Sequence, residues 1–312
     1  MLTRELIETV GFDSADSEVI LQKHSLYYER LIPFIDNYTL KLGLEPYVPY
    51  TIETGKVANL AAVDYVNECI KALPEENEYF ARLLAWLELL PFLKKKYKEL
   101  GIGDDIFTYT VNDIYCKVRE CRSVHGVLGV FVNWFFLFYD VKLFGFGRLQ
   151  FECKEYGIQD YTFGDYTIKK GDTVFNCHIP TSGPVTLSSC LESFDRAYHF
   201  FKPRLSGSIL PIMCASWLLY PPYIEKVFPE GSNTKNFARL FAPVTTTETE
   251  SFSDAWRVFD KDINDTTDID ALPCKTSMQR AFVNYMKSPD ATYGYGHGVI
   301  LWDGENKKII NN

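Results

Sequence analysis

Apolar residues recur at intervals of three and four along the first part of the chain. The pattern covers residues 2–10, 18–42, 56–73 and 76–100. Such spacing places apolar side chains on one face of a helix, so each segment is predicted to be helical. Pro91 lies inside the last segment, and because proline cannot donate the helical hydrogen bond we expect a kink or a break there. A shorter helix is predicted over residues 110–122, with Thr110 or Asn112 as its N-cap.

Beyond residue 143 the pattern changes to a period of two. Residues 148–153 alternate between polar and apolar side chains, as a half-buried strand does. Short runs rich in β-branched and aromatic residues, separated by Gly and Asp, predict further strands. These cover residues 166–168, 173–179, 212–219, 244–250, 256–259 and 298–302. Helical patterns fall between them, over residues 187–201, 232–241 and 276–286.

The change of period divides the chain into two predicted domains. Residues 1–142 form a helical N-terminal domain, and residues 143–312 form a domain of strands and helices. A length of 312 residues accommodates two domains, since single cores stop growing near about 250–300 residues. The order of strands, loops and helices predicts crossover connections, hence a mixed and partly parallel sheet flanked by helices, an α+β or α/β architecture.

The charge pattern argues against nucleic acid and membrane as partners. The net charge is −9, and no stripe of Lys and Arg interleaved with aromatic residues occurs. Arg82 and Glu88 interrupt the apolar run 80–93, and the run 128–138 falls short of the roughly 20 residues that a spanning helix needs. We therefore expect neither nucleic-acid binding nor membrane insertion.

The eight cysteines form no C-x-x-C pair and match no zinc-binding spacing with histidine. Reduced thiols among apolar neighbours, and an N-terminal segment unlike a signal peptide, predict a cytoplasmic protein. The run Asp260-x-Asp262-x-Asn264 resembles the start of a calcium-binding loop. The glycine and glutamate that such a loop requires are replaced by Asp265 and Ala271. No metal site is predicted.

His178 ends one of the predicted strands and is a candidate general base. Histidine has an unperturbed pKa of about 6.5 and can accept a proton from an ammonium group or water near neutral pH. Strand alternation places Asn176 and His178 on one face and Cys177 on the other, which excludes a Cys177–His178 nucleophile–base pair. The alternative is a structural histidine that bonds to the following turn.

Three polar residues at a period of two, Arg148, Gln150 and Glu152, form a ladder on one face of their predicted strand. Such a ladder indicates either a solvated face or a buried polar network. The functional alternative is a cleft wall that orients an acceptor, with Glu152 as a second candidate base.

Five sets of residues occur together in the second part of the chain. They are Gly147-Arg-Leu-Gln-Phe-Glu152, His178-Ile-Pro-x-x-Gly-Pro184, Cys214-Ala-Ser-Trp-Leu-Leu-x-Pro221, Ser232-Asn233 with Phe237 and Phe241, and Leu272-Pro-x-x-Thr276 with Gln279-Arg280-Ala281. Together they resemble the bacterial acyltransferase domain-containing family, which has a helical N-terminal domain and a GNAT-like C-terminal acyltransferase domain. The resemblance implies a GNAT-like mixed β-sheet flanked by helices.

The resemblance also implies where a donor binds. An acyl-coenzyme A lies in a V between two splayed parallel strands, here residues 173–179 and 212–219, and the helix after the first strand presents its N-terminus to the pyrophosphate. The implied coenzyme A contacts are Val174, Asn176, Thr181, Ser182, Gly183, Ser216 and Trp217. Trp217, which lies in an apolar run, is alternatively a core residue.

The implied activity is an acyl-coenzyme A-dependent N-acyltransferase that acts on a small amine. His178 is the implied base, with Glu152 and Arg148 on the acceptor side. Residues 181–183 differ from the phosphate loop usual in GNAT enzymes, and Pro184 removes an amide donor. These differences favour the alternative, a non-catalytic GNAT-like binding or assembly module.

Overall fold

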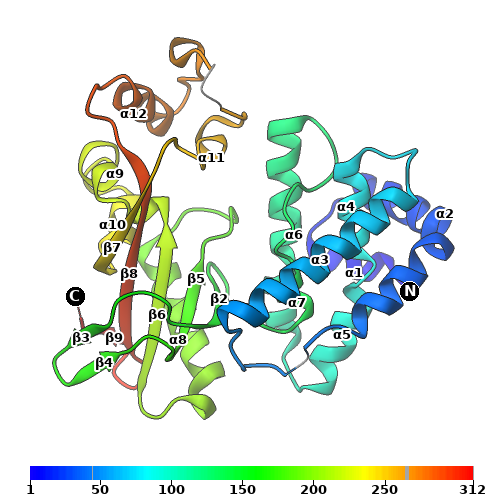
Figure 1. The fold of residues 1–312 in the computed structure, drawn as a ribbon, viewed down its shortest axis with the longest axis horizontal. Helices are drawn as coiled ribbons and strands as arrows, with labels where there is room; N and C mark the ends of the chain where they lie inside the picture. Colours follow the sequence, from blue (N-terminus) through cyan, green and yellow to red (C-terminus); the bar gives the residue numbers. More distant parts are fainter. Residues whose placement is uncertain (44, 264–266, 312) are drawn as a thin grey trace. The chain divides into compact units, whose positions relative to one another are not determined.

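The computed structural model describes residues 1–43, 45–263 and 267–311, which divide into two compact units (Figure 1). Unit 1 comprises Met1–Lys154 with Ile179–Ser182. Unit 2 comprises Glu155–His178 and the chain from Gly183 onward. The domain boundary predicted after residue 142 stays a prediction, since the strand pair that follows it lies mostly in unit 1.

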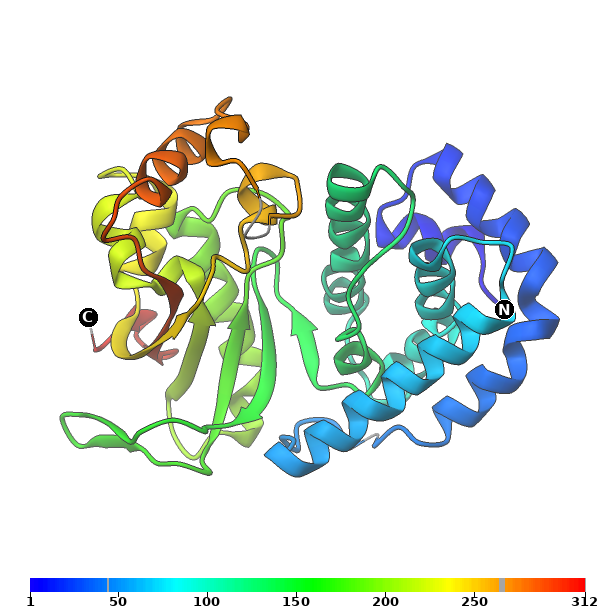
Figure 2. The same cartoon turned by 45° about the horizontal axis from the view of Figure 1, so that its top comes forward.

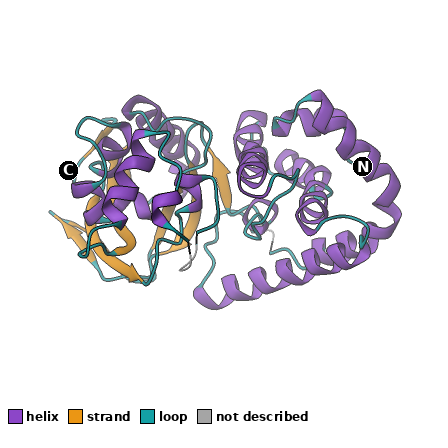
Figure 3. Cartoon of the chain, turned by 90° about the horizontal axis from the view of Figure 1, so that it is seen from above, coloured by secondary structure: helices purple, strands orange, loops and turns teal. Residues whose placement is uncertain are grey.

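Unit 1 is predominantly helical, as predicted (Figure 3, purple). Its helices are α1 (Arg4–Val10), α2 (Ser14–Thr39), α3 (Ile52–Ala72), α4 (Glu78–Leu87), α5 (Leu90–Glu99), α6 (Asp104–His125) and α7 (Phe136–Tyr139). The predicted interruption at Pro91 is a break, because α4 ends at Leu87 and the proline lies in the first turn of α5. There its missing N–H costs no helical hydrogen bond.

The helix predicted over residues 110–122 was too short, and both predicted N-caps are wrong. The N-cap of α6 is Gly103. The Thr110 hydroxyl donates to the carbonyl four residues earlier, and the Asn112 side chain donates to the Val10 carbonyl, which joins α6 to α1. The Gly-Asp-Asp start of α6 has no apolar position, so periodicity alone did not reveal it.

The core of unit 1 is aromatic. The Trp86 ring stacks on Tyr139, with centroids 5.7 Å apart, and meets Tyr65 and Phe135 edge-on, at 6.0 Å each. All four side chains are buried. Their combined apolar area drives the packing of α3, α4 and α7 around one centre.

Unit 1 also contains β1 (Leu143–Gly145) and most of β2 (Gln150–Glu155), which pair antiparallel. Gly145 lies against α6, where a Cβ atom would come within 2.4 Å of the Tyr109 carbonyl carbon. Its amide donates to the Thr110 hydroxyl at 2.8 Å. A glycine is required here because backbone packs directly on backbone.

Unit 2 is built on a mixed sheet, which confirms the predicted fold class. Its strands, in spatial order, are β5 (Thr173–His178), β6 (Ile209–Ser216), β8 (Tyr293–Asp303) and β7 (Ala242–Thr249), with β9 (Lys308–Ile309) paired to β8. The β5–β6 pair is parallel and the other pairs are antiparallel. The helices are α8 (Leu187–Phe201), α9 (Pro221–Lys226), α10 (Asn233–Ala238), α11 (Trp256–Phe259) and α12 (Ser277–Met286). A separate hairpin of β3 (Tyr161–Phe163) and β4 (Tyr166–Ile168) projects from the sheet (Figure 2).

The two faces of this sheet are covered differently. On one face α8 packs on β5, with the Phe175 and Phe201 ring centroids 4.2 Å apart. The other face carries Val174 on β5, Met213 on β6 and Val299 on β8 in one apolar cluster, with residues near the β3–β4 hairpin packed against it. The β3–β4 region therefore supplies part of the cover of the face opposite α8.

Two predicted strands of unit 2 need correction. Residues 256–259 form α11 rather than a strand, because the amide of Phe259 bonds to Ala255 in helical fashion. The strand predicted over 212–219 ends at Ser216, whose hydroxyl accepts from the Leu218 amide and begins a 3₁₀ turn. β-branched and aromatic composition indicated strands in both places, and local capping prevailed.

The acidic loop predicted over residues 260–270 includes 264–266, which lie outside the described residues; the calcium-loop candidate is partly among them. Helix 276–286 is confirmed as α12, with Thr276 as its N-cap and Gln279 completing a capping box.

Candidate functional site

The parallel strands β5 and β6 pair over a short stretch only. Their ladder consists of Phe175 with Ile212 and Asn176 with Met213 in these fully described strands. Beyond it, β5 continues to His178 and β6 to Ser216. The β5–β6 ladder therefore ends before either strand does, toward their carboxyl ends.

His178 lies at the carboxyl end of β5, half-buried, with its Nε2 3.0 Å from the side-chain nitrogen of Asn176. An amide nitrogen only donates, so in this arrangement Nε2 accepts and a neutral His178 carries its proton on Nδ1. The predicted sharing of one face by Asn176 and His178 is thereby observed as a contact.

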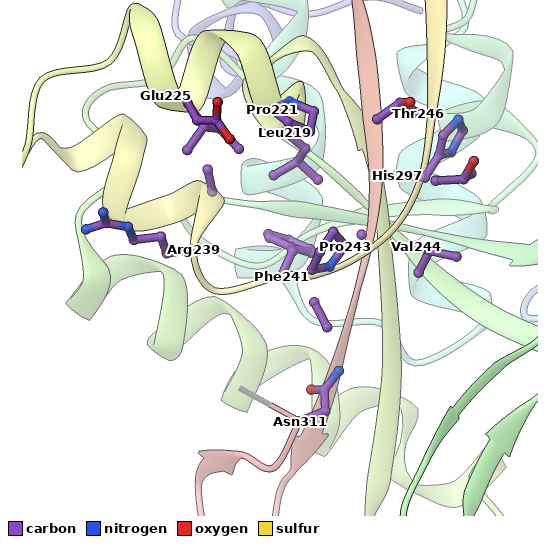
Figure 4. Close-up of a pocket in the computed structure, with 15 residues that line it drawn as sticks. Leu219, Pro221, Glu225, Arg239, Phe241, Pro243, Val244, Thr246, His297 and Asn311 are labelled. Carbon is purple, nitrogen blue, oxygen red and sulfur yellow. The ribbon is translucent and has the colours of Figure 1, made fainter.

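A second histidine, which the sequence analysis did not single out, lies on β8. The run Tyr293-Gly294-Tyr295-Gly296-His297-Gly298 alternates between rings and glycines. A Cβ atom on Gly296 would lie 2.0 Å from the Leu219 carbonyl oxygen, so the glycine side of the strand packs against backbone. His297 therefore projects from the opposite side, away from Leu219 (Figure 4).

The His297 ring is held by two neighbours. Its Nε2 lies 3.3 Å from the Thr247 hydroxyl on β7, and its centroid lies 5.2 Å from that of Tyr295. Strict period-2 alternation with glycine at every second position was the signal that could have found it. The strand predicted over residues 298–302 begins at Tyr293 in the structure, five residues earlier.

Sheet register places the two histidines on the same face. Asn176 pairs with Met213, and Ala215, two residues further along β6, pairs with His297. Directly paired residues share a face, and so do residues two apart, so His178 belongs to this face too. We call Asn176, His178, Ala215 and His297 the histidine face. Ala215 is exposed although its strand has neighbours on both sides, so this part of the face is open.

A pocket of about 750 Å³ wraps the β7 edge of the sheet (Figure 4). Its walls are mainly apolar side chains of α9, of β7 and of the segment between α10 and β7, among them Ile224, Val244 and Phe241. Glu225 and Arg239 also line it. Its size suits a small molecule. β7 is the last strand in the order β5-β6-β8-β7, and His297 of the neighbouring β8 also lines the pocket, so the pocket reaches the histidine face at its end away from β5.

Residues 180–182 of the turn predicted to face an anion make hydrogen bonds within unit 1. The Thr181 hydroxyl donates to Glu120 of α6 at 2.8 Å, and Arg148 donates to the Pro180 carbonyl at 2.7 Å and contacts the Ser182 hydroxyl at 3.5 Å. Thr181 is therefore committed to a carboxylate, which disfavours an anion at its side chain. Ser182 is exposed. The predicted role of Thr181 and Ser182 in anion binding stays a prediction.

On the unit 2 side, Gly183 is exposed with φ +140°, and open space lies where its Cβ would be. Helix α8 follows, with Thr186 as N-cap accepting from the Ser189 amide. The amides of Leu187 and Ser188 have no carbonyl partner within the helix by its geometry. These amides and the helix dipole form an anion-favouring end.

Two residues of the predicted polar ladder, Gln150 and Glu152, lie on β2 and are buried, whereas Arg148 precedes the strand and is half-buried. Gln150 and Glu152 are 1% and 8% exposed, and Gln150 donates to the Thr110 carbonyl at 3.1 Å. Arg148 joins the same region through its bond to Pro180. The buried-network interpretation of the ladder is the one observed, and catalytic roles for Glu152 and Arg148 stay predictions.

Three predicted coenzyme A contacts have structural partners. Val174 lies in the apolar cluster of the sheet, and the Ser216 hydroxyl caps a 3₁₀ turn. The Trp217 ring packs edge-on against Phe228, Phe252 and Phe282. These contacts match the core alternative for Trp217, and the predicted ligand contacts of all three remain predictions.

Among the described residues no group of His, Cys, Asp and Glu side chains is placed to hold a metal ion. In the same part of the chain, no helix combines the length and apolar character needed to cross a membrane.

Two family models match the chain. One, described as a GNAT-like C-terminal domain, covers residues 143–300, and the other, an N-acyltransferase N-terminal domain, covers residues 51–141. A solved acyltransferase in complex with CoA and 10C-teicoplanin is similar to this chain, with a TM-score of 0.68 and 20% identity over 96% of this chain and 87% of that one. A solved acyltransferase in complex with decanoyl-CoA and teicoplanin is also similar, with a TM-score of 0.67 and 20% identity over 96% of this chain and 87% of that one. No curated protein matches the sequence.

Proposed function

This chain belongs to the GNAT-like C-terminal domain family, and we propose that it transfers an acyl group from acyl-coenzyme A to the amino group of a small molecule. The observation that carries the proposal is the parallel β5–β6 pair that stops pairing before its ends, with His178 at one end and the N-terminus of α8 next along the chain.

The donor side fits an acyl-coenzyme A chemically. β5 extends beyond its last pair with β6, and a strand backbone at this place suits the amides of a pantetheine arm. The anion-favouring end of α8 suits a pyrophosphate, and exposed Gly183 lets a phosphate approach the backbone closely. Solved proteins of the same fold were crystallised with CoA or decanoyl-CoA, which supports this choice of donor.

His178 then serves as the general base at the bond being made. The nitrogen of the acceptor attacks the thioester carbonyl carbon, the carbon–nitrogen bond forms, and the carbon–sulfur bond breaks with its electron pair on sulfur. His178 takes a proton from the attacking nitrogen through Nε2, the atom that now accepts from Asn176. Rotation of the Asn176 amide offers its oxygen to the imidazolium instead, so one side chain supports both protonation states.

His178→Ala tests this role. A general base contributes about 10²–10⁴-fold, so we expect kcat to fall at least about a hundredfold, measured as thiol release from acyl-coenzyme A in the presence of amines. The melting temperature should change little, since His178 is half-buried and its partner Asn176 can rehydrate.

His199→Ala is the matched control, because His199 is 61% exposed on α8. An unchanged rate in His178→Ala together with a lowered melting temperature would assign His178 a structural role and make buried Glu152 the next candidate base. Unchanged rates in both His178→Ala and Glu152→Gln would mean that neither residue is the general base.

Two observations favour a second candidate, a GNAT-like binding or assembly module without catalysis. Thr181 is held by Glu120, and Pro184 supplies no amide to the turn before α8. A chain that binds no coenzyme A species and releases no thiol with any amine tested would be such a module.

A further inference from the structure

We propose that His297 is a second proton acceptor, which takes the proton from the incoming ammonium group of the acceptor while His178 acts at the bond being made. The inference rests on the proposed acyl transfer and assigns the two histidines different steps of it.

The geometry that carries the inference is the histidine face. Ala215 pairs directly with His297, and His178 lies on the same face of the strand on the other side of β6. Where β5 and β6 still pair, at Asn176, two strand spacings of about 10 Å separate the backbones of β5 and β8, and His178 lies two residues past this last pair. The exposed methyl group of Ala215 leaves the space between the two imidazoles open. A thioester carbonyl and an amine nitrogen fit across such a span.

The positions of the strands decide which histidine serves which partner. β5 is one arm of the proposed donor V, so His178 lies beside the thioester. β8 lies on the far side of β6 from the donor strands, so an acceptor that approaches from beyond β6 meets His297. Tyr293 and Tyr295 continue along the same side of β8, and Thr247 and Thr249 pair with Tyr295 and Tyr293 on β7.

The surroundings of His297 suit a group that changes its protonation state. The Thr247 hydroxyl can donate to a neutral Nε2 or accept from an imidazolium N–H, and at 3.3 Å this bond is weak enough to exchange. The titratable groups that share this face include Tyr295 and Tyr293 on β8 and His178 on β5, and Tyr156, Tyr161 and Tyr166 pack on its apolar part; burial raises the pKa of Tyr293. Glu248 of β7 pairs with Gly294 and projects from the other face.

The reaction has a place for two proton acceptors. An alkylammonium must lose one proton before its nitrogen can attack, and the same nitrogen loses a second proton after the carbon–nitrogen bond forms. His297 takes the first proton and returns it to solvent. His178 takes the second and delivers it to the departing sulfur, giving the amide, free coenzyme A and one released proton. No oxidant, reductant or further reactant is needed.

The test compares two acceptors that differ in protonation. A primary alkylamine is an ammonium ion at pH 7, whereas methoxyamine is neutral there. With His297→Gln we expect kcat/KM for the alkylamine to fall at least about a hundredfold and that for methoxyamine to fall less than about tenfold. His178→Ala should lose activity with both acceptors, because both nitrogens must shed a proton after attack.

Thr247→Val is the second variant, in case His297→Gln does not fold. It keeps the side-chain shape and removes the hydroxyl partner of His297, so we expect a selective loss with the alkylamine. The matched controls are Thr246→Val, at the neighbouring position that faces the other side of β7, and His199→Gln, whose side chain on α8 is exposed.

Two results distinguish a wrong role for His297 from the absence of acyl transfer. The inference is wrong if His297→Gln and Thr247→Val reduce kcat/KM equally for the alkylamine and for methoxyamine, or reduce it for neither acceptor. This holds when the melting temperature and the affinity for coenzyme A are those of the wild type. If the wild-type chain releases no thiol with either amine, acyl transfer itself fails, and the inference is overturned with it.

Discussion

Burial raises the pKa of the Asp140 carboxyl, a single residue in unit 1. Its carboxyl is 2% exposed, and desolvation raises its pKa to about 7, with Lys142 and the Gly43 amide opposing the rise. Lys142 is also buried and donates to the carbonyls of Glu45 and Val48, at 2.6 and 2.7 Å. The carboxyl therefore holds its proton more tightly in the folded chain than in the unfolded one.

Asp140→Asn should change how stability depends on pH. A carboxyl whose pKa rises on folding contributes stability that is full below its unfolded pKa of about 3.9 and is lost as pH increases through 7. We expect the variant to lose less stability than wild type between pH 5 and 8, and to be the more stable of the two at pH 8. Urea unfolding at several pH values measures this.

The control for this change is Asp165→Asn, at an exposed turn, which should leave the pH profile as it is. An Asp140→Asn profile parallel to that of wild type would mean that the carboxyl is already ionised below pH 5 in the folded chain.

Residue-scale prediction from sequence succeeded where the determinant was local. The shared face of Asn176 and His178 follows from strand alternation alone. The interaction of Thr181 depends on which segment packs beside it, since its partner Glu120 lies 61 residues earlier in the chain. Residue types at a fixed spacing carry no information about such partners.

At the scale of elements, β8 is defined by what it packs against. Gly294, Gly296 and Gly298 face Thr247, Leu219 and Phe241, which belong to β7, the 3₁₀ turn and the segment after α10. Periodicity could not reveal this strand before residue 298, because the constraint is steric and comes from distant sequence. The helix predicted over 110–122 failed differently, since its first turn holds charges that serve the helix dipole rather than the core.

Gly296→Ala should destabilise the protein. The new Cβ would lie 2.0 Å from the Leu219 oxygen and 2.5 Å from its carbonyl carbon, and because both are backbone atoms the strand itself must shift. Overpacking of this kind costs about 1–3 kcal/mol, which urea unfolding resolves. Activity should fall further than the stability loss implies, because the shift moves His297.

Gly207→Ala provides the matched control, since no atom lies within 4 Å of the Cβ it would gain. A Gly296→Ala variant as stable as Gly207→Ala would show that β8 is less tightly held on the Leu219 turn than the structure indicates.

At the scale of the whole molecule, strand order was beyond reach of the sequence pattern. The last long strand, β8, inserts between β6 and β7, although β7 precedes it in the chain. Periodicity predicted a mixed sheet and correctly expected parallel pairing, which occurs between β5 and β6. The family resemblance added which two strands are expected to hold a donor, because the motif that begins at His178 starts at the end of β5 and the motif that begins at Cys214 starts on β6.

Coenzyme A binding is the whole-molecule test of that arrangement. A ligand at about 100 times its dissociation constant stabilises the folded state by roughly 2.7 kcal/mol, so coenzyme A or an acyl-coenzyme A should raise the melting temperature clearly. Adenosine, which lacks the pyrophosphate and pantetheine, should raise it less at equal concentration, because it reaches neither the α8 amides nor the β5 backbone. Equal shifts for adenosine and coenzyme A would place binding away from the β5–β6 pair, and no shift for any coenzyme A species would favour the module without a donor.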